Sequence, residues 1–280
     1  MVTQIKNLDG DIIREIKTGP LLRVDWHGAD LKHADLTEID LSGANLIGAN
    51  LRGACVTKTN FTGANLTGAD LSYAFGEGAV FSGAGLSNAC LYGAKLKNCS
   101  FMAADLRNAS FSHAQFHGAN MLRANLSSVT AEYTEFHNAK LVCAQLVNAE
   151  LSYANLMQAD LSEASLENAN LSETRLHFAN MSHASLSKAN LSHAKVNHAN
   201  FKNACLLDAN LSDVNLVVAK NAPVVIHFLP WPVLIYRDHA QIGCQTIFRD
   251  NIMVDHDYEH HLEKYLPALN AIWDIAFPLD

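Results

Sequence analysis

The sequence predicts an all-β solenoid, a rod of stacked square coils that ends in a small C-terminal α+β cap. Two observations predict the rod. A large apolar residue returns at every fifth position from Trp26 to Leu216, which gives 39 positions without an insertion or deletion. Of these positions, here called centres, 37 hold Leu, Phe, Met, Val or Trp, and Ala stands two residues before the centre in 31 of the 39 units. Neither the 3.6-residue period of a helix nor the two-residue period of a strand gives this spacing.

A five-residue unit can point its large and its small apolar residue inward only if the chain turns at every unit. Four turns then close a square coil of 20 residues, and the small alanines let neighbouring walls approach closely. Successive coils would hydrogen-bond like parallel strands about 4.8 Å apart. The repeats therefore predict a rod roughly 45 to 50 Å long at that interstrand spacing.

The repeated pattern Ala-(Asp/Asn)-Leu-x-x resembles that of the pentapeptide repeat family. It is clearest in "ADLSEASLENANLSETRLHFANMSHASLSKANLSHA", and the resemblance extends from about Val24 to Ala219, about 70% of the chain. The resemblance implies a right-handed quadrilateral β-helix. Internal repetition of this length decides the fold before other signals are considered.

Three parts are expected: an N-terminal β-hairpin cap over residues 1–23, the β-helix over 24–219, and a β-strand plus helix module over 220–280. Asp9-Gly10 lies between two short Ile-rich runs, which is typical of a hairpin turn. Such a hairpin would cover the first coil, because a bare end exposes unpaired strand edges and apolar interior.

In the C-terminal part, the stretch from Pro223 to Phe248 predicts two or three strands, separated by the turn 230–232 and by residues 237–240. Residues 257–277 predict a helix with a broad apolar stripe. Together with the N-terminal hairpin, this part resembles the flanks of phage and prophage pentapeptide repeat proteins. Candidate contacts of this module with the rod or with a second copy are Trp231, Leu266, Trp273 and Phe277.

The composition of the chain bears on membrane insertion, cellular compartment and nucleic-acid binding. The chain has no 18-residue apolar run and no basic, apolar N-terminus, so we expect neither a membrane span nor a signal peptide. Six cysteines without a C-x-x-C pair favour free thiols in the cytoplasm. Because the net charge is −8, we expect no direct binding to nucleic acid.

The resemblance raises the alternative of a DNA mimic, since the family includes proteins that protect DNA gyrase from quinolones. Between Asp25 and Ala219 the chain has 17 acidic and 12 basic residues, a net charge of −5. Duplex DNA of that length would carry on the order of 28 negative charges. The gyrase-protecting relatives also often carry loops that interrupt the coil, whereas the register here is unbroken.

Groups that could carry chemistry are few, and each has a structural explanation that we favour. His239 with Asp238 and Cys244 lacks any oxyanion signature. His256 and His260 have the spacing of two ligands on a helix, but no third ligand can be named. The outward column of His117, His137 and His177 has no carboxylate column beside it. We therefore expect no enzyme activity and no cofactor or metal.

Stepping by 20 residues identifies two columns of outward residues that could bind a partner. The first is aromatic, and tyrosine is a common interface anchor; its rings could equally do no more than stack on one another and stiffen the coil. The second is aliphatic and replaces the Ser or Thr of most other coils, with Val147 around the corner. The candidates are Tyr73, Tyr92, His113, Tyr133 and Tyr153 in the first column and Met102, Leu122 and Val142 in the second.

The carboxylates of Asp25, Asp30, Asp35 and Asp40 form a ring around the first coil. Short polar side chains at turns commonly bond nearby backbone amides, and we favour that role over docking. The sequence thus predicts a non-enzymatic rod that binds another protein, with a bacterial or phage protein as the natural target. The alternative is a DNA mimic that binds gyrase or another topoisomerase.

Overall fold

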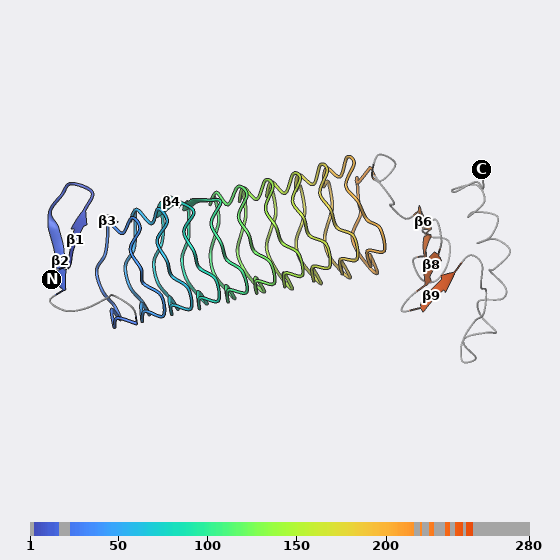
Figure 1. Cartoon of the computed structure of the whole chain (residues 1–280). Helices are drawn as coiled ribbons and strands as arrows, with labels where there is room; N and C mark the ends of the chain where they lie inside the picture. Colours follow the sequence, from blue (N-terminus) through green and yellow to red (C-terminus); the bar gives the residue numbers. More distant parts are fainter. Residues whose placement is uncertain are drawn as a thin grey trace.

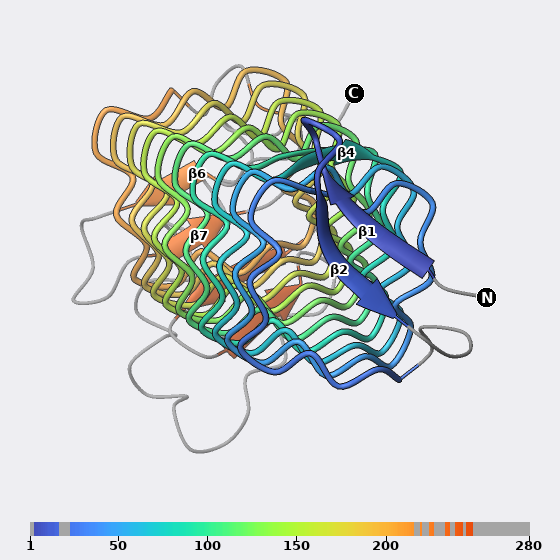
Figure 2. The same cartoon turned by 90° about the vertical axis from the view of Figure 1, so that its left-hand side faces the viewer.

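A computed structural model describes residues 3–16 and 23–215, Ala219, and four short strands between 224 and 248. Residues 23–215 wind into a rod of stacked coils (Figure 1). Parallel bridges join residues 20 apart along the whole rod, from Asp25 with Asn45 to Asn190 with Asn210. The coil length is therefore constant, and the coils superimpose with a four-sided outline when seen from the end (Figure 2).

Except at Gly76 and Leu96, each described corner of the coil is a hydrogen-bonded β-turn that begins at a centre. In the unit of Leu46, the Leu46 carbonyl accepts the Ala49 amide at 3.0 Å, and Gly48, two after the centre, has φ +62°. A positive φ at the third residue of such a turn is the type II pattern. The same position is left-handed throughout the rod, also where it holds Asn, His or Tyr. The residues one and two after each centre therefore form the outward corners.

Hydrogen bonds use every amide of such a unit. Two amides bond forward to the next coil, as Leu46 does to the Asn65 carbonyl at 2.7 Å, and one bonds back, as Asn65 does to the Ala44 carbonyl at 2.9 Å. The turn uses the fourth, and the Asn45 side chain accepts the fifth, from Ile47, at 3.3 Å. Backbone amides that are removed from water need hydrogen-bond partners. This need explains why Asp or Asn often stands immediately before the centre. The same bond is made, as we favoured, by Asp25, Asp30, Asp35 and Asp40.

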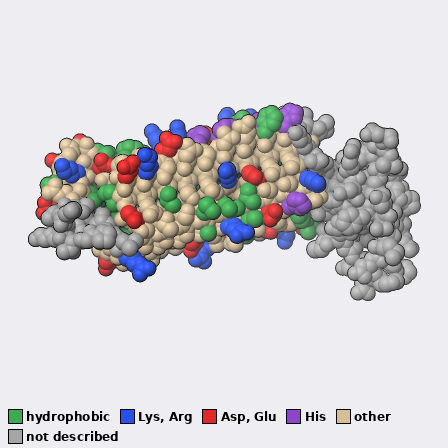
Figure 3. Space-filling model, viewed as in Figure 1, with side chains coloured by type: hydrophobic (Ala, Val, Ile, Leu, Met, Phe, Trp, Pro, Cys, Tyr) green, Lys and Arg blue, Asp and Glu red, His purple; other side chains and the backbone are tan. Residues whose placement is uncertain are grey.

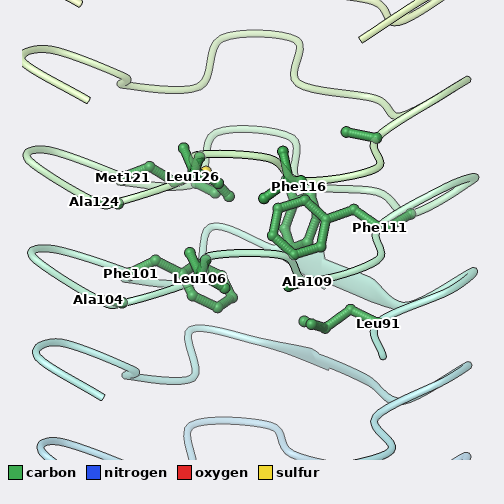
Figure 4. Packing of buried hydrophobic residues seen from close by; sticks show 14 of the residues in the cluster. Leu91, Phe101, Ala104, Leu106, Ala109, Phe111, Phe116, Met121, Ala124 and Leu126 are labelled. Atoms are coloured by element: carbon green, nitrogen blue, oxygen red, sulfur yellow. The ribbon is translucent and has the colours of Figure 1, made fainter. Parts of the chain in front are cut away.

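The core is one continuous column of centres and alanines. Phe61, Phe81 and Phe101 stack with ring centroids 4.8 and 4.7 Å apart, which is the coil spacing. Phe116 meets Phe101 and Phe111 edge to face at 5.6 and 5.2 Å (Figure 4). Edge-to-face and offset stacks are the favourable arrangements for such rings. The apolar pattern therefore builds a packed interior at these coils.

An antiparallel hairpin covers the first coil. It consists of β1 (Thr3–Asn7) and β2 (Ile12–Ile16), and β1 also pairs with β3 (Ala34–Asp35) of the rod. Ile5 is fully buried in the core cluster, and the Arg14 guanidinium lies 5.1 Å from the centroid of Trp26. At the turn, Gly10 has φ +95°, a conformation that suits glycine.

Two further short strands lie within the rod, and four form a separate antiparallel sheet in the order β6-β7-β8-β9. The sequence predicted two or three strands here, and the structure has four. β8 begins inside the expected turn at 237–240, and only two residues separate β8 from β9. The expected turn at 230–232 and the helix over 257–277, with Trp231, Leu266, Trp273 and Phe277, lie outside the described residues. The strands are β4 (Phe75–Glu77), β5 (Lys95–Lys97), β6 (Val224–Ile226), β7 (Val233–Ile235), β8 (His239–Ile242) and β9 (Gln245–Phe248).

Candidate protein-binding surfaces

One corner of the rod carries an unbroken row of rings, here called the aromatic column: Tyr73, Tyr92, His113, Tyr133 and Tyr153. Tyr92 meets Tyr73 and His113 edge to face at 5.6 and 5.5 Å. His113, Tyr133 and Tyr153 then stack almost parallel, with centroids 5.2 and 4.9 Å apart. The predicted column is thus continuous over five consecutive coils.

The turn geometry places these rings. Tyr73, His113, Tyr133 and Tyr153 occupy the left-handed position of their turns, with φ between +56° and +62°. That conformation is unfavourable by roughly 1–2 kcal/mol for a residue with a Cβ. The remaining turn of the column, between those of Tyr73 and His113, has Gly93 there instead, and a Cβ on Gly93 would lie 2.9 Å from the Tyr73 ring. Glycine therefore makes room for Tyr73, and Tyr92, one residue earlier, supplies the missing ring.

The rings both stack and face solvent. Tyr73, Tyr133 and Tyr153 are 48%, 48% and 49% exposed, and Tyr92 is 38% exposed. The sequence left binding of a partner and mutual stacking as alternatives; the structure shows the stacking, and the exposed part of each ring is accessible to a partner. The column is a fixed, half-exposed aromatic ridge.

Charge gathers on the face that leads into this corner, whose centres run from Leu31 to Leu211. By the 20-residue register it holds six acidic and two basic residues, a net charge of −4, whereas the whole rod is at −5. The acidic residues are exposed or half-exposed and continue past the end of the aromatic column. They are Asp30, Asp70, Glu132, Glu150, Glu173 and Asp213.

On the side of the rod that Figure 3 shows, charges of both signs are interspersed. Among the described residues, the shortest ion pair joins Arg107 to Asp105 at 2.7 Å. The Arg107 hydrogen bond is the main reason why the pKa of Asp105 is lowered. Such pairs neutralise the surface locally. The net negative charge is therefore concentrated on the one face described above and does not surround the rod.

The aliphatic column of Met102, Leu122 and Val142 lies on the corner opposite the aromatic column, because their centres are half a coil apart. Met102 is exposed, but Leu122 and Val142 are half-buried, as is Val147 on the next corner. Cys143 beside them contacts the Glu163 carboxylate at 3.4 Å. This surface is less exposed than the aromatic column.

The histidine column does not assemble a metal site. The rings of His117 and His137 are 6.4 Å apart, and a single carboxylate, Glu135, lies 4.0 Å from His117. Burial is the main cause that lowers the pKa of His117, and Nδ1 of this ring has no hydrogen-bond partner. Met157 separates these residues from His177. Within the described residues no three His, Cys, Asp or Glu side chains gather as metal ligands do.

The side chains of the other predicted chemical groups, around His239 and His256, lie outside the described residues. Five cysteines are free thiols in the described part of the chain. In the same part, no helix has the length and apolar character needed to cross a membrane.

Sequence reasoning missed two exposed aromatic residues. Phe178 is 56% exposed and stacks on His198 at 4.9 Å. Phe75, in β4, is 38% exposed. Phe178 stands two after a centre, the same outward position as the tyrosines, so the register alone could have found it.

Comparison with known families accounts for the whole rod. A family model described as pentapeptide repeats matches eight overlapping segments that together extend over residues 27–217, well over half of the chain. The chain belongs to the pentapeptide repeat family. Membership of the family implies that the β-helix is right-handed. Proteins of the family are generally structural or binding proteins rather than enzymes.

Solved pentapeptide repeat structures resemble this one. HetL, a protein involved in heterocyst differentiation regulation in the cyanobacterium Nostoc sp. strain PCC 7120, is 32% identical over 68% of this chain and 88% of its own, with a TM-score of 0.33. QnrB1, a plasmid-mediated fluoroquinolone resistance protein, is 20% identical over 63% of this chain and 88% of its own, with a TM-score of 0.43. A thylakoid lumen protein of Arabidopsis thaliana is 26% identical over 36% and 68%, with a TM-score of 0.32. A search of curated proteins found no match.

Proposed function

We propose that this pentapeptide repeat protein is a non-enzymatic rod that binds another protein through the aromatic column. The observation that carries the proposal is the row of five rings, from Tyr73 to Tyr153, that is fixed in place and yet exposed. The interior does not need these rings, since the centres and alanines already fill it. Their position instead suits contact with a partner.

Rigid tyrosines are efficient contact residues. A tyrosine presents a large apolar ring with a polar hydroxyl and loses little side-chain freedom on binding, and tyrosines are enriched among energetically dominant interface residues. Here each ring is already ordered by its neighbours in the stack, which lowers the entropy that binding must remove. The column extends over four coil spacings, about 20 Å.

Two features of the chain support a proposal for the kind of partner and for its location. The flanks resemble those of phage and prophage members of the family, which favours a bacterial or phage protein as the partner. Free thiols favour a cytoplasmic protein, since oxidising compartments promote disulfides. The C-terminal module, through Trp231, Leu266, Trp273 and Phe277, would serve to cap the rod or to join two copies.

Pull-down from bacterial lysate tests the proposal with a matched pair of variants. The first carries Tyr73→Asn, Tyr133→Asn and Tyr153→Asn; asparagine already occupies this left-handed position in other turns, for example at Asn138, and tolerates it. The control carries Arg123→Asn, Glu163→Asn and His183→Asn. These residues have the same position in the repeat but lie on the opposite corner.

We expect a protein that the native chain and the control retain and the tyrosine variant loses. Equal retention by both variants would exclude the aromatic column as the contact. In that case Met102→Ser, Leu122→Ser and Val142→Ser, which introduce the residue typical of that position, test the aliphatic column in the same way. Loss with this second variant would move the contact to the opposite corner.

The second candidate function is a DNA mimic that binds a topoisomerase. The observation in its favour is the net charge of −4 on one face of the rod. Against it stands the weak overall charge, since duplex DNA of that length would carry on the order of 28 negative charges. Inhibition of DNA gyrase supercoiling by the purified protein would support this function, and no inhibition at an excess of protein over gyrase would exclude it.

A further inference from the structure

The two ends of the aromatic column differ. At the first end the Arg52 guanidinium lies over the Tyr73 ring, 4.8 Å from its centroid, so the chain itself supplies a cation to the outer face of this ring. At the other end Tyr153 stacks on Tyr133 with an interplanar angle of 4°, which turns the second face of Tyr153 toward the next coil. The residue in the same position of that coil is Glu173.

Glu173 leaves its charge available. It has φ +59° like the tyrosines before it, and its side chain is exposed. Among the described residues no cationic group lies within 4.0 Å of its carboxylate, although Arg175 follows two residues later. Tyr153 is anchored to this coil by its amide, which donates to the Ser172 carbonyl at 3.0 Å. An aromatic face and a carboxylate without an ion-pair partner among the described residues therefore lie one coil apart at the same corner.

We propose that Tyr153 and Glu173 form a cation site that takes an arginine side chain of the protein partner. This deepens the proposed function and, in naming the partner's chemistry, rests on it. The ring face attracts a cation through its quadrupole, and the carboxylate pairs with the same group. Arg52 over Tyr73 is an example within the chain of the contact between a guanidinium and a tyrosine ring.

The charge of the surroundings selects a basic partner. The face that leads into the column has six acidic and two basic residues, and Glu132 and Glu150 flank the stacked half of the column. A planar guanidinium suits this site better than an ammonium, because it can stack on the ring while its edge donates to the carboxylate. The occupant is therefore a basic segment whose arginine binds at the Tyr153 end.

Fluorine NMR of the whole protein labelled with 3-fluorotyrosine tests the site. The probe is N-acetylarginine amide, and the matched control ligand is N-acetylcitrulline amide, which is planar and nearly isosteric but neutral. The Tyr153 resonance is assigned from its absence in Tyr153→Phe. We expect a saturable shift of this resonance with the arginine derivative and a much smaller one with the citrulline derivative.

Two substitutions separate the ion pair from general electrostatics. Glu173→Gln should weaken the arginine response about two- to fivefold, the range of an exposed ion pair. Glu163→Gln, the same substitution on the opposite corner, should leave it unchanged. Equal shifts with both ligands, or an unchanged response in Glu173→Gln, would overturn the cation site. If the tyrosine variant still loses its partner in the pull-down, the proposed function survives that result.

Discussion

Each residue of the rod is constrained by its position within the five-residue unit. Two before the centre the side chain points inward and is Ala in most units, and Cys99 stands there in place of the usual Ala. It is fully buried, and its sulfur lies 3.5 Å from the Lys97 carbonyl oxygen. Burial raises the pKa of the Cys99 thiol to about 12.

Cys99 should therefore resist alkylation in the folded protein. The thiolate is the reactive form of cysteine. With a pKa of about 12, the Cys99 thiol stays protonated in the folded protein at any pH well below that value. With iodoacetamide at pH 8, mass spectrometry should find Cys99 unmodified while the half-buried Cys90 is labelled. After unfolding in urea both should react. Labelling of Cys99 at the rate of Cys90 in the native protein would contradict the burial described here.

Elements of the rod depend on close approach between coils. Gly76 is one of the two centres without a large side chain, and it lies in β4 against the preceding coil. A Cβ on Gly76 would lie 2.6 Å from the Thr57 backbone nitrogen and 2.7 Å from the Val56 carbonyl carbon. Backbone atoms cannot move aside as a flexible side chain can, so this centre has room only for glycine.

Gly76→Ala should thus lower the free energy of unfolding by about 1–3 kcal/mol, the usual cost of overpacking. Gly85→Ala is the control, because a Cβ there would meet only side-chain atoms at 3.6 Å or more. It should be neutral or stabilise by about 0.4–1 kcal/mol through the unfolded chain. Urea unfolding measures both. Equal effects of the two substitutions would contradict the close contact at Gly76.

The hairpin cap gives an independent prediction at the level of elements. Ile5→Ala removes a fully buried side chain and should destabilise the cap by about 2–5 kcal/mol. Ile12→Ala, in the same hairpin but 49% exposed, should change stability by under about 0.5 kcal/mol. Because each coil contacts only its neighbours, the effect should be local. Hydrogen exchange should accelerate in residues 3–16 for Ile5→Ala alone.

The sequence predicted the rod well because its period is unlike that of any other element and never shifts. Trp26 to Leu216 fixed both the coil length and the order of residues on each corner, including the aromatic column. Pairing of β1 with β3 could not be predicted, since it joins segments without a repeat. The register does not predict side-chain packing. It therefore could not predict how exposed the tyrosines are, the space that Gly93 leaves, or the contact of Arg52 with Tyr73.

At the scale of the whole molecule, the rod presents its two apolar columns on opposite corners. A partner that contacts the tyrosines from one side therefore cannot reach Met102 at the same time without wrapping around the coil. Substitutions in the two columns should have additive effects, because distant sites that share no partner interact little. The rod thus offers two independent surfaces, of which the aromatic one is the more exposed and lies beside the more acidic face.

Site-specific photo-crosslinking tests the central claim, that the aromatic column is the protein-binding surface. Benzoylphenylalanine replaces Tyr133 in one protein and Arg123, at the same repeat position on the opposite corner, in another. Both are irradiated in bacterial lysate, and the products are identified by mass spectrometry. The account predicts one discrete crosslinked protein from position 133 and none from position 123. Crosslinking of the same protein from position 123 but not from 133 would contradict it.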